Sequence, residues 1–497
     1  MSKKRRRKRK TNNKKKKIRF KTKNIIKLII TLIMLILSII CFIYVNNLNV
    51  LPGKYLLLFI LILFVMNIIS SILLFSKGRI KNIIGIILYI VLAFISIVGI
   101  KYVGNTIDYL DSGFNNNDVE LTTYNIIVLN DSNYQKTEDL ENTKMGYLFI
   151  EISNSNYLDV IKQKVNTELK QLDVSELYKD LMNKKIESII INDGYISLIE
   201  EEYPDFSSKT KILESYDIEV ERENKIEKIN KLEPTNIYLS GTDSRSSNIS
   251  SNGTSDVNMI VTINPEQHKI LLTNIPRDYY VQLHGTTGLK DKLTHAGFYG
   301  IDMSKKTIED LMNIEIDYSV KVGFNSVIKL VDLVGGIDIY SDISFQSHCK
   351  DGGAKSVYVK KGWNHFNGAQ ALSFARERFA YEDGDRQRGR NQQEVIKAIF
   401  NKMITDKSIL LKYDSLLNEF SKLYRTDIPK ELITLLIKHQ LDDMPSWSIE
   451  TQSVDGYGAA GTTYSMPGYD NLYVMIPYTE TVEAASKKIN ETLNIKN

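Results

Sequence analysis

Five arginines stand close together in one segment of the 497-residue chain, residues 368–397. They are Arg376, Arg378, Arg386, Arg388 and Arg390. Arginine presents a planar fork of fixed donors that suits phosphate oxygens, so the segment is a candidate cradle for a phosphorylated ligand. The alternative is a pair of solvated, charged helices, because four carboxylates in the segment could pair with the arginines: Glu377, Glu382, Asp383 and Asp385.

Two helical patterns carry these arginines. Good helix formers fill residues 369–374, and a second helical pattern runs from about residue 386 to residue 404. Arg388 and Gln392 are four residues apart and therefore share one helix face. Arg376 and Arg378 are two residues apart, so both can address one target only if the first helix ends there.

Charged residues also stand at the ends of three predicted strands. The strands are residues 235–240, 257–263 and 268–275, and the charged residues beside them are Asp243, Arg245, Asp256, Arg277 and Asp278. Because ligands of open α/β sheets collect outside strand ends, we expect four of these side chains to converge: Asp243, Asp256, Arg277 and Asp278. Carboxylates beside arginines suit Mg²⁺ clamped against phosphate. Taken singly, each Asp also fits a turn or a cap, and the Arg-Asp dipeptide fits a surface ion pair.

The net charge of +5 hides a basic N-terminus. Residues 1–23 hold 15 of the 64 Lys and Arg residues and no acid, which leaves 49 basic against 59 acidic side chains in the remainder. That remainder is a poor binder of nucleic acid. The tail itself is too short and too uniformly basic for a folded DNA-binding domain. We therefore interpret it as a determinant of membrane topology that also meets anionic lipid.

Three apolar runs follow the tail: residues 28–45, 55–75 and 83–100. Each has about the length of a membrane-spanning helix, roughly 20 residues. A cleaved signal peptide fits poorly, because two more spans follow at once. Core helices fit poorly too, because the runs have no polar face. The positive-inside rule then places the N-terminus in the cytoplasm and everything after about residue 101 outside.

The outer part holds one cysteine, Cys349, and the other, Cys41, lies in the first apolar run. Such thin cysteine usage favours a bacterial surface protein over a secreted eukaryotic one. Residues 104–232 alternate strand-like and helical runs, which predicts a small α/β domain. The expected strands are 125–129, 146–152 and 186–191, and the expected helices are 157–172 and 175–183.

A series of longer motifs covers most of residues 234–404. In order they are GTDSR, SDVNMIVTINP, LLTNIPRDYYV, KLTHAGFYG, VGFNSVIKLVDLVGGIDI, FNGAQALSFARERF and GDRQRGRNQQEVIKAI. This series resembles the LytR-CpsA-Psr family, and the three N-terminal spans resemble its capsule-associated branch. The resemblance implies an α/β fold with a mixed sheet flanked by helices. It also implies a Mg²⁺-dependent phosphotransferase that moves a glycan polymer, capsular or teichoic-acid-like, from a polyprenyl-pyrophosphate carrier to peptidoglycan.

The resemblance also assigns roles by position. Asp243 and Asp256 match metal-associated acidic positions, and with Arg277 they form the expected catalytic group. The positions expected to bind pyrophosphate are Arg245, Arg277, Lys292, Arg376, Arg378, Arg388 and Gln392. Many members have Arg at the position of Thr254, so either one arginine of the pyrophosphate set is missing here or Arg245 or Lys292 substitutes for it. Asp385 is either a further ligand or a cap of the second helix, and we favour the cap.

The resemblance completes the predicted organisation. Residues 1–24 form a cytoplasmic tail, 25–103 three membrane helices, 104–232 an extracellular accessory domain and 233–497 the phosphotransferase domain. Two alternatives remain open: hydrolysis of polyprenyl pyrophosphate, and a non-enzymatic membrane-bound regulator.

Other features favour plain structural interpretations. His295 stands in a Thr-Ala context typical of a structural histidine, and Trp363 and Trp447 are isolated and predicted to pack. Residues 456–461 fit GxGxxG but lack the strand–turn–helix context of a dinucleotide site, so we expect a surface loop. The glycines at 335 and 336 predict a helix C-cap turn.

Overall fold

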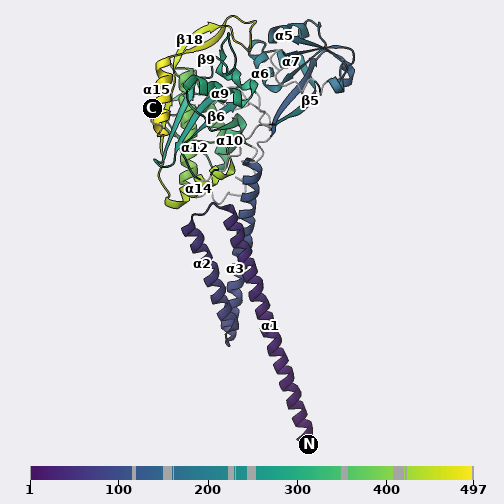
Figure 1. Cartoon of the computed structure of the whole chain (residues 1–497), viewed down its shortest axis with the longest axis vertical. Helices are drawn as coiled ribbons and strands as arrows, with labels where there is room; N and C mark the ends of the chain where they lie inside the picture. The colour runs from purple at the N-terminus through teal and green to yellow at the C-terminus, as the bar shows by residue number, and fades with distance from the viewer. Residues whose placement is uncertain are drawn as a thin grey trace. The chain divides into compact units, whose positions relative to one another are not determined.

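The computed structural model describes residues 2–114, 119–148, 162–221, 231–242, 253–348, 356–406 and 423–494, together with positions 159, 229 and 419. The chain forms two compact units. The first comprises Met1–Asp111 and Lys430–Pro445, and the second comprises Ser112–Pro429 and Ser446–Asn497. Figure 1 traces the chain through both units from the N-terminus to the C-terminus.

The first unit contains the three predicted apolar helices. They are α1 (Ser2–Leu48), α2 (Gly53–Phe75) and α3 (Arg79–Phe114), and each holds a window long and apolar enough to cross a membrane. A Cβ atom added at Gly85 would lie 2.7 Å from the backbone nitrogen of Leu74. Glycine therefore lets α2 and α3 approach closely, as small residues do between helices in lipid.

One later helix belongs to the same unit. α14 (Lys430–Asp443) is inserted between two strands of the second unit. Lys54 at the start of α2 pairs with Asp442 at 2.8 Å, and Lys430 pairs with Asp111 of α3 at 2.5 Å. The contacts join α14 to the ends of α2 and α3.

The second unit begins with a five-stranded sheet in the order β3-β2-β4-β1-β5. Its strands are β1 (Val119–Leu129), β2 (Lys144–Leu148), β3 (Glu168–Leu172), β4 (Ser188–Asn192) and β5 (Thr210–Glu221). Its helices are α5 (Val174–Met182), α6 (Asp193–Glu202) and α7 (Phe206–Lys209). The α/β prediction is confirmed here, but the helix predicted over 157–172 is wrong at its end, because residues 168–172 pair with β2 as a parallel strand.

A six-stranded mixed sheet follows, in the order β16-β11-β6-β7-β8-β17. Its strands are β6 (Thr235–Thr242), β7 (Val257–Asn264), β8 (Lys269–Ile275), β11 (Tyr318–Gly323), β16 (Tyr424–Thr426) and β17 (Ser448–Ser453). β11, β6, β8 and β17 run in one direction, and β7 and β16 run against them. Four parallel strands therefore end at the same edge of the sheet.

Helices cover both faces of this sheet. α9 (Ile301–Met312) and α15 (Thr479–Thr492) share a buried core with Leu271 and Ile275 of β8. α12 (Asp385–Thr405) instead lies over Leu272 and Asn274 of β8, since Gln393 donates to the Leu272 carbonyl at 3.0 Å. Alternate strand residues point to opposite faces, so α12 covers the second face. The predicted sheet with helices on both faces is confirmed.

Short ribbons and helices complete the unit. They are β9 (Tyr280–Val281), β10 (Asp291–Lys292), α8 (Leu293–Ala296), α10 (Phe324–Leu333), β12 (Ile337–Ser341), β13 (Phe345–Gln346), β14 (Tyr358–Val359), β15 (Gly362–Phe366), α11 (Gly368–Arg376), β18 (Gly456–Gly461) and β19 (Leu472–Pro477). The loop predicted at 456–461 is wrong, because these residues pair with β19 as β18. The turn at Gly335 and Gly336 is confirmed, with φ of 85° and 88°.

The two sheets of the second unit share a hydrophobic core. Leu177, Tyr195 and Leu198 of the first sheet's helices cluster with Phe298, Met466 and Leu472, which come from the larger lobe. The rings of Tyr195 and Phe298 stack with centroids 5.2 Å apart. The five-stranded lobe is therefore packed directly against the lobe that follows it.

Candidate phosphate-binding site

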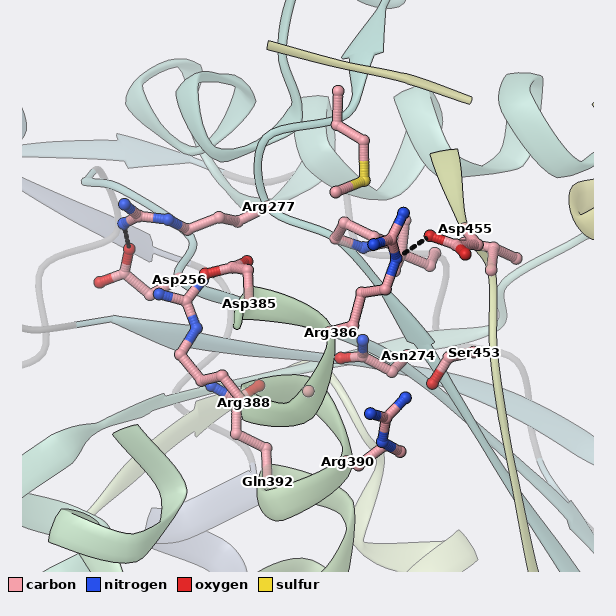
Figure 2. Close-up of a pocket in the computed structure, with 15 residues that line it drawn as sticks. Asp256, Asn274, Arg277, Asp385, Arg386, Arg388, Arg390, Gln392, Ser453 and Asp455 are labelled. Atoms are coloured by element: carbon pink, nitrogen blue, oxygen red, sulfur yellow. Dashed lines mark hydrogen bonds and ion pairs between the residues drawn. The ribbon is translucent and has the colours of Figure 1, made fainter. Parts of the chain in front are cut away.

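A cleft lies at the edge where the parallel strands end. It has a volume of about 140 Å³, and Figure 2 shows its lining side chains. Its charged and polar lining residues are Asp256, Asn274, Arg277, Asp385, Arg386, Arg388, Arg390, Gln392, Ser453 and Asp455. Four arginines and three carboxylates therefore meet around one cleft.

Asp256 and Arg277 form one wall of the cleft. Asp256 stands directly before β7, and Arg277 follows the end of β8 at Pro276. Arg277 Nη1 donates to Asp256 Oδ1 at 2.5 Å, and the two side chains are 23% and 14% exposed. Such a charge-assisted bond fixes the guanidinium, so Arg277 is already oriented before a ligand arrives.

The first turns of α12 form the floor. Arg388 and Gln392 both line the cleft, in agreement with their shared helix face. Arg388 Nη2 donates to Asp385 Oδ2 at 2.9 Å, and Figure 2 shows its guanidinium directed toward Asp256. Burial lowers the pKa of Arg388, and the positive charge of Arg277 lowers it further. The negative charge of Asp385 acts in the opposite direction and raises this pKa. An anion between Arg277 and Arg388 would relieve their mutual repulsion.

Asp385 is a cleft residue rather than a cap. The residue before α12 is Gly384, with φ of 53°, and no side chain caps that helix start. Asp385 is the first residue of α12 and holds Arg388. The prediction of a capping role is therefore wrong, because the left-handed conformation at Gly384 already turns the chain into the helix.

Arg386 and Arg390 add positive charge on the other side of α12. Arg386 Nε donates to Asp455 Oδ1 at 2.5 Å and its Nη2 donates to the Gly456 carbonyl at 2.7 Å. The hydrogen bond to Asp455 raises the pKa of Arg386. Asp455 follows the end of β17, as Arg277 follows the end of β8. Asp455 was not predicted as a site residue, although its position after a strand is the signal used for Arg277.

A glycine sets the distance between α12 and the sheet. A Cβ atom at Gly389 would lie 2.3 Å from Asn274 Nδ2 and 2.9 Å from Asn274 Cγ. Asn274 is itself buried. Glycine at 389 therefore allows the arginine-bearing turn of α12 to lie against the end of β8.

Three glycines hold the segment that carries Asp256. Gly253 donates its N–H to the Gly297 carbonyl at 3.0 Å, and a Cβ atom at Gly297 would lie 2.2 Å from the Gly253 carbonyl oxygen. On the other side, a Cβ atom at Gly194 of α6 would lie 2.8 Å from Gly253 Cα. The backbone three residues before Asp256 is thus held between the larger lobe and α6.

Hydrogen bonds continue this support up to Asp256. The Ser255 hydroxyl is buried and bonds with the hydroxyls of Tyr238 at 3.0 Å and Ser240 at 2.8 Å. The Asp256 N–H donates to the Gly241 carbonyl at 2.7 Å. The Asp256 carboxylate therefore projects from a backbone that is fixed on both sides.

Comparison with known proteins identifies the family to which this arrangement belongs. The profile of the LytR_cpsA_psr family matches residues 203–490, which is more than half of the chain. The chain belongs to the LytR_cpsA_psr family. The matched residues include Asp256 and Arg277, which form the wall of the cleft, and all of α12, which forms its floor.

Relatives and solved structures of this family give further comparisons. A Bacillus anthracis protein named polyisoprenyl-teichoic acid–peptidoglycan teichoic acid transferase TagU is 33% identical over 235 residues, covering 47% of this chain and 74% of its own. TagV of Bacillus subtilis is 31% identical over 244 residues, covering 49% and 60%. The crystal structure of B. subtilis TagV aligns at a TM-score of 0.45 with 28% identity, covering 54% of this chain and all of that one. A structure titled TagT bound to LIIa-WTA aligns at 0.43 with 25% identity, covering 55% and 95%.

Three of the positions assigned by resemblance to the LytR_cpsA_psr family lie outside the cleft lining. Arg376 ends α11 and stands over the Phe324 ring, 4.9 Å from its centroid. Phe324 follows the end of β11, so Arg376 lies on the same edge of the sheet as the cleft. Arg378 is exposed and stands over the Phe379 ring at 4.7 Å. Lys292 is buried, with its Nζ 3.9 Å from Asp278 Oδ1.

Glu377 explains why Arg376 and Arg378 project differently. Its carboxylate is buried and accepts the N–H groups of Arg378, Phe379 and Ala380 at 3.0, 2.7 and 3.1 Å. Burial alone would raise the pKa of Glu377, but backbone hydrogen bonds, led by that of His348, outweigh it and the pKa is lowered. Glu377 therefore stabilises the turn after α11. Its carboxylate also lies near the His348 ring, with Oε1 3.4 Å from Nδ1.

The predicted metal ligands are described only in part. Asp243 and Arg245 lie outside the described residues. Among the residues that are described, no group of three or more His, Cys, Asp and Glu side chains could hold a metal ion. The cleft does present the carboxylates of Asp256 and Asp385, and one or two carboxylates with phosphate oxygens are the donors that Mg²⁺ uses. The donor types therefore fit that ion.

His295 is a structural residue. Its ring is fully buried, stacks on Phe298 with centroids 5.4 Å apart, and its Nδ1 lies 2.6 Å from Asp291 Oδ1. The other oxygen of Asp291 accepts the backbone N–H of Ser465 at 2.9 Å and the Ser465 hydroxyl. This buried network ties α8 to the β18–β19 connection and has no exposed face for catalysis.

Proposed function

We propose that this protein transfers a phosphate-linked glycan polymer from a polyprenyl-pyrophosphate carrier to peptidoglycan. The observation that carries the proposal is the cleft that Arg277, Arg386, Arg388 and Arg390 line at the ends of parallel strands. The names of the related transferases, which specify a polyisoprenyl-linked donor and a peptidoglycan acceptor, support the same choice.

The arrangement of the arginines suits a pyrophosphate better than a single carboxylate. Arg277 comes from the wall after β8 and Arg388 from the floor on α12, and Arg386 and Arg390, each paired with a carboxylate, lie toward β17. Such donors stabilise charge that develops on phosphorus oxygens as a bond breaks. Asp256, Asp385 and Asp455 keep the guanidinium groups in place before the donor binds.

The proposed reaction exchanges one phosphorus–oxygen bond for another. A sugar hydroxyl of peptidoglycan attacks the phosphorus that carries the glycan and forms a phosphodiester. The bond from that phosphorus to the bridging oxygen breaks, and polyprenyl phosphate leaves. The hydroxyl proton passes to a carboxylate, for which Asp256 is our assignment among the described residues. No covalent intermediate on the protein is needed, because positioning and charge stabilisation supply the rate.

Magnesium is part of the proposal. Asp256, with Asp385 facing the same space, would hold the ion against the pyrophosphate. Bound Mg²⁺ would neutralise negative charge on the phosphate oxygens. We extend the assignment to Asp243, which precedes Asp256 in the predicted metal pair.

The membrane helices give the reaction a location. With the basic tail in the cytoplasm, three spans leave the cleft on the outer side, where peptidoglycan lies. A donor with a polyprenyl chain stays in the same bilayer, so the anchor restricts the enzyme and its donor to one surface.

The test uses the full chain reconstituted in liposomes with Mg²⁺, a polyprenyl-pyrophosphate-linked glycan and peptidoglycan fragments. Mass spectrometry of the products should detect glycan joined to the fragment through phosphate. Arg277→Ala should abolish the conjugate, whereas Lys329→Ala, which removes an exposed cation of α10, should preserve it.

Two other outcomes of this assay would contradict the proposal. Free glycan phosphate together with polyprenyl phosphate, without a conjugate, would identify a hydrolase. Tight lipid binding with no product at all would identify a regulator. A conjugate that forms equally well in the presence of a chelator would remove Mg²⁺ from the mechanism and leave the arginine site intact.

A further inference from the structure

A second feature of the larger lobe lies outside the cleft, on the two-stranded ribbon of β12 and β15. The strands pair in antiparallel register, with Asp338 opposite His365 and Tyr340 opposite Trp363. Residues alternate between buried and exposed along both strands. One face packs into a core with α11 and α12, and the other face is open to solvent.

The open face carries two large aromatic rings side by side. Trp363 is 66% exposed and Tyr340 is 48% exposed, so the prediction that Trp363 packs inside is wrong. The ring centroids lie 5.6 Å apart with planes at 75°. Single exposed apolar side chains are ordinary on protein surfaces, whereas an adjacent Trp–Tyr pair on one face of the ribbon is a candidate binding surface, since these residue types are enriched among binding hot spots.

Polar groups stand next to the rings on the same face. Asp338 Oδ1 lies 2.7 Å from His365 Nδ1, and both side chains are about 60% exposed. This pair is two residues along each strand from the aromatic pair, a distance of about 7 Å. An exposed aromatic ring that stacks on the C–H face of a sugar, with hydrogen-bonding groups about one sugar width away, suits a saccharide chain.

Two lysines add charge beside this face. Lys360 and Lys361 lie in the turn that leads into β15 and are exposed. The turn is fixed because Asn364 bonds both the N–H and the carbonyl of Lys360, at 3.0 and 2.8 Å. Neither lysine has an ion pair among the described residues. The positive charge of these two exposed lysines beside the rings suits a glycan that bears phosphate groups.

The same helix, α12, packs against the ribbon and lines the cleft. Val395 and Ile399 of α12 pack against Ile337 and Ile339 of β12, whereas Arg388 lines the cleft. Seven residues separate Arg388 from Val395, which is about 10 Å along a helix. A polymer whose pyrophosphate occupied the cleft would therefore have to extend past this stretch of α12 to reach the ribbon.

We propose that Tyr340 and Trp363, with Asp338 and His365, form a binding platform for the glycan part of the donor. The proposal rests on the proposed function for the identity of the ligand, because the transferred polymer is the phosphate-bearing glycan that the protein meets. The membrane surface is the competing partner. It fits less well, because the two rings lie beside the hydrogen-bonded Asp338–His365 pair, a polar neighbour that suits sugar hydroxyls better than acyl chains.

The test measures binding without transfer. The full chain in nanodiscs is titrated with a phosphodiester-linked hexasaccharide that has no lipid and no pyrophosphate, and binding is followed by tryptophan fluorescence and by calorimetry. Trp363→Ala should weaken binding about tenfold or more, since truncation of a tryptophan that anchors a binding surface commonly has at least that effect. Trp363→Phe should retain most of the affinity, and Ile212→Ala, an exposed apolar residue of the other lobe, should change nothing.

A transfer assay separates this role from a structural one. Trp363→Ala should raise KM for a polymeric donor and leave kcat unchanged. With a donor shortened to its first disaccharide, the variant and the parent protein should have the same KM and kcat. Equal hexasaccharide affinity in the parent and in Trp363→Ala would overturn the platform. Loss of binding to anionic vesicles in that variant, with glycan binding intact, would assign the face to the membrane instead.

The two proposals fail in different ways. If the hexasaccharide binds through Trp363 but no conjugate forms, the transferase proposal falls and the platform stands. If a conjugate forms and Trp363→Ala binds the hexasaccharide normally, the platform falls and the transferase stands.

Discussion

Gly194→Ala tests whether the five-stranded lobe positions the cleft. The new methyl group would lie 2.8 Å from Gly253 Cα and 2.9 Å from its nitrogen. Ordinary contacts of this kind begin at 3.4 Å, so α6 and the Gly253 backbone must separate by about 0.6 Å. Both atoms belong to the main chain, so a change of side-chain rotamer cannot absorb the displacement.

The expected loss of rate depends on how far this displacement spreads along the chain. Gly253 is bonded to Gly297 on its other side and cannot move freely in that direction. Part of the shift must therefore pass along the chain to Asp256. Misplacement of a reacting group by about 1 Å can cost roughly 100-fold, so about 0.6 Å corresponds to roughly a tenfold loss of rate. Stability should change less, because overpacking costs about 1–3 kcal/mol and alanine stabilises the helix by about 1 kcal/mol relative to glycine.

The assay compares initial rates of conjugate formation in liposomes with thermal unfolding of the same samples. We expect a rate about tenfold lower for Gly194→Ala and a melting temperature within a few degrees of the parent protein. Gly461→Ala is the matched control, because its Cβ would meet only ordinary contacts at 3.6 Å and beyond. A variant at 194 with the parent rate would refute the view that α6 positions Asp256, and an equal loss in both variants would assign the effect to glycine replacement in general.

Two further predictions address single side chains. Arg388→Lys should lower the initial rate about 100-fold at saturating Mg²⁺, because lysine cannot reproduce the fork that faces both Asp385 and the cleft; a rate within twofold of the parent would exclude a role in phosphate binding. Glu377→Gln should destabilise the protein by about 1–3 kcal/mol at pH 7, measured by denaturant unfolding, because one of the oxygens that accept backbone N–H groups becomes a donor. Since the folded pKa of Glu377 lies below its ordinary value of 4.5, its stabilisation is present above that pH and is lost as the pH falls through the folded pKa. The difference between parent and variant should therefore shrink toward pH 3, and a pH-independent difference would contradict the reasoning.

Local sequence patterns predicted those parts of the site that depend on spacing within one element. Arg388 and Gln392 face the cleft together because a spacing of four residues fixes a helix face. Asp256 and Arg277 meet because strand ends on the same edge of a sheet bring their loops together. Both arguments need only the element type and the direction of the chain.

Contacts between distant elements were not predictable in this way. Asp455 joins the cleft because β17 pairs beside β8, and nothing in the polar sequence of β17 identifies it as a strand next to that one. β18 was missed because a glycine-rich run resembles a loop until its partner β19 is known. Trp363 was assigned to the interior because its exposure depends on which face of β15 packs against α12.

The shared core described for the two lobes has a practical consequence for anyone who cuts or recombines this gene. A fragment that starts at residue 233, the boundary predicted from sequence, would leave Phe298, Met466 and Leu472 without the apolar side chains that cover them. It would also lose Gly194 from beside Gly253. Such a fragment should be prone to aggregation. A chimera that carries a relative's first lobe should fold only if the core residues of both lobes that meet at this interface are exchanged together.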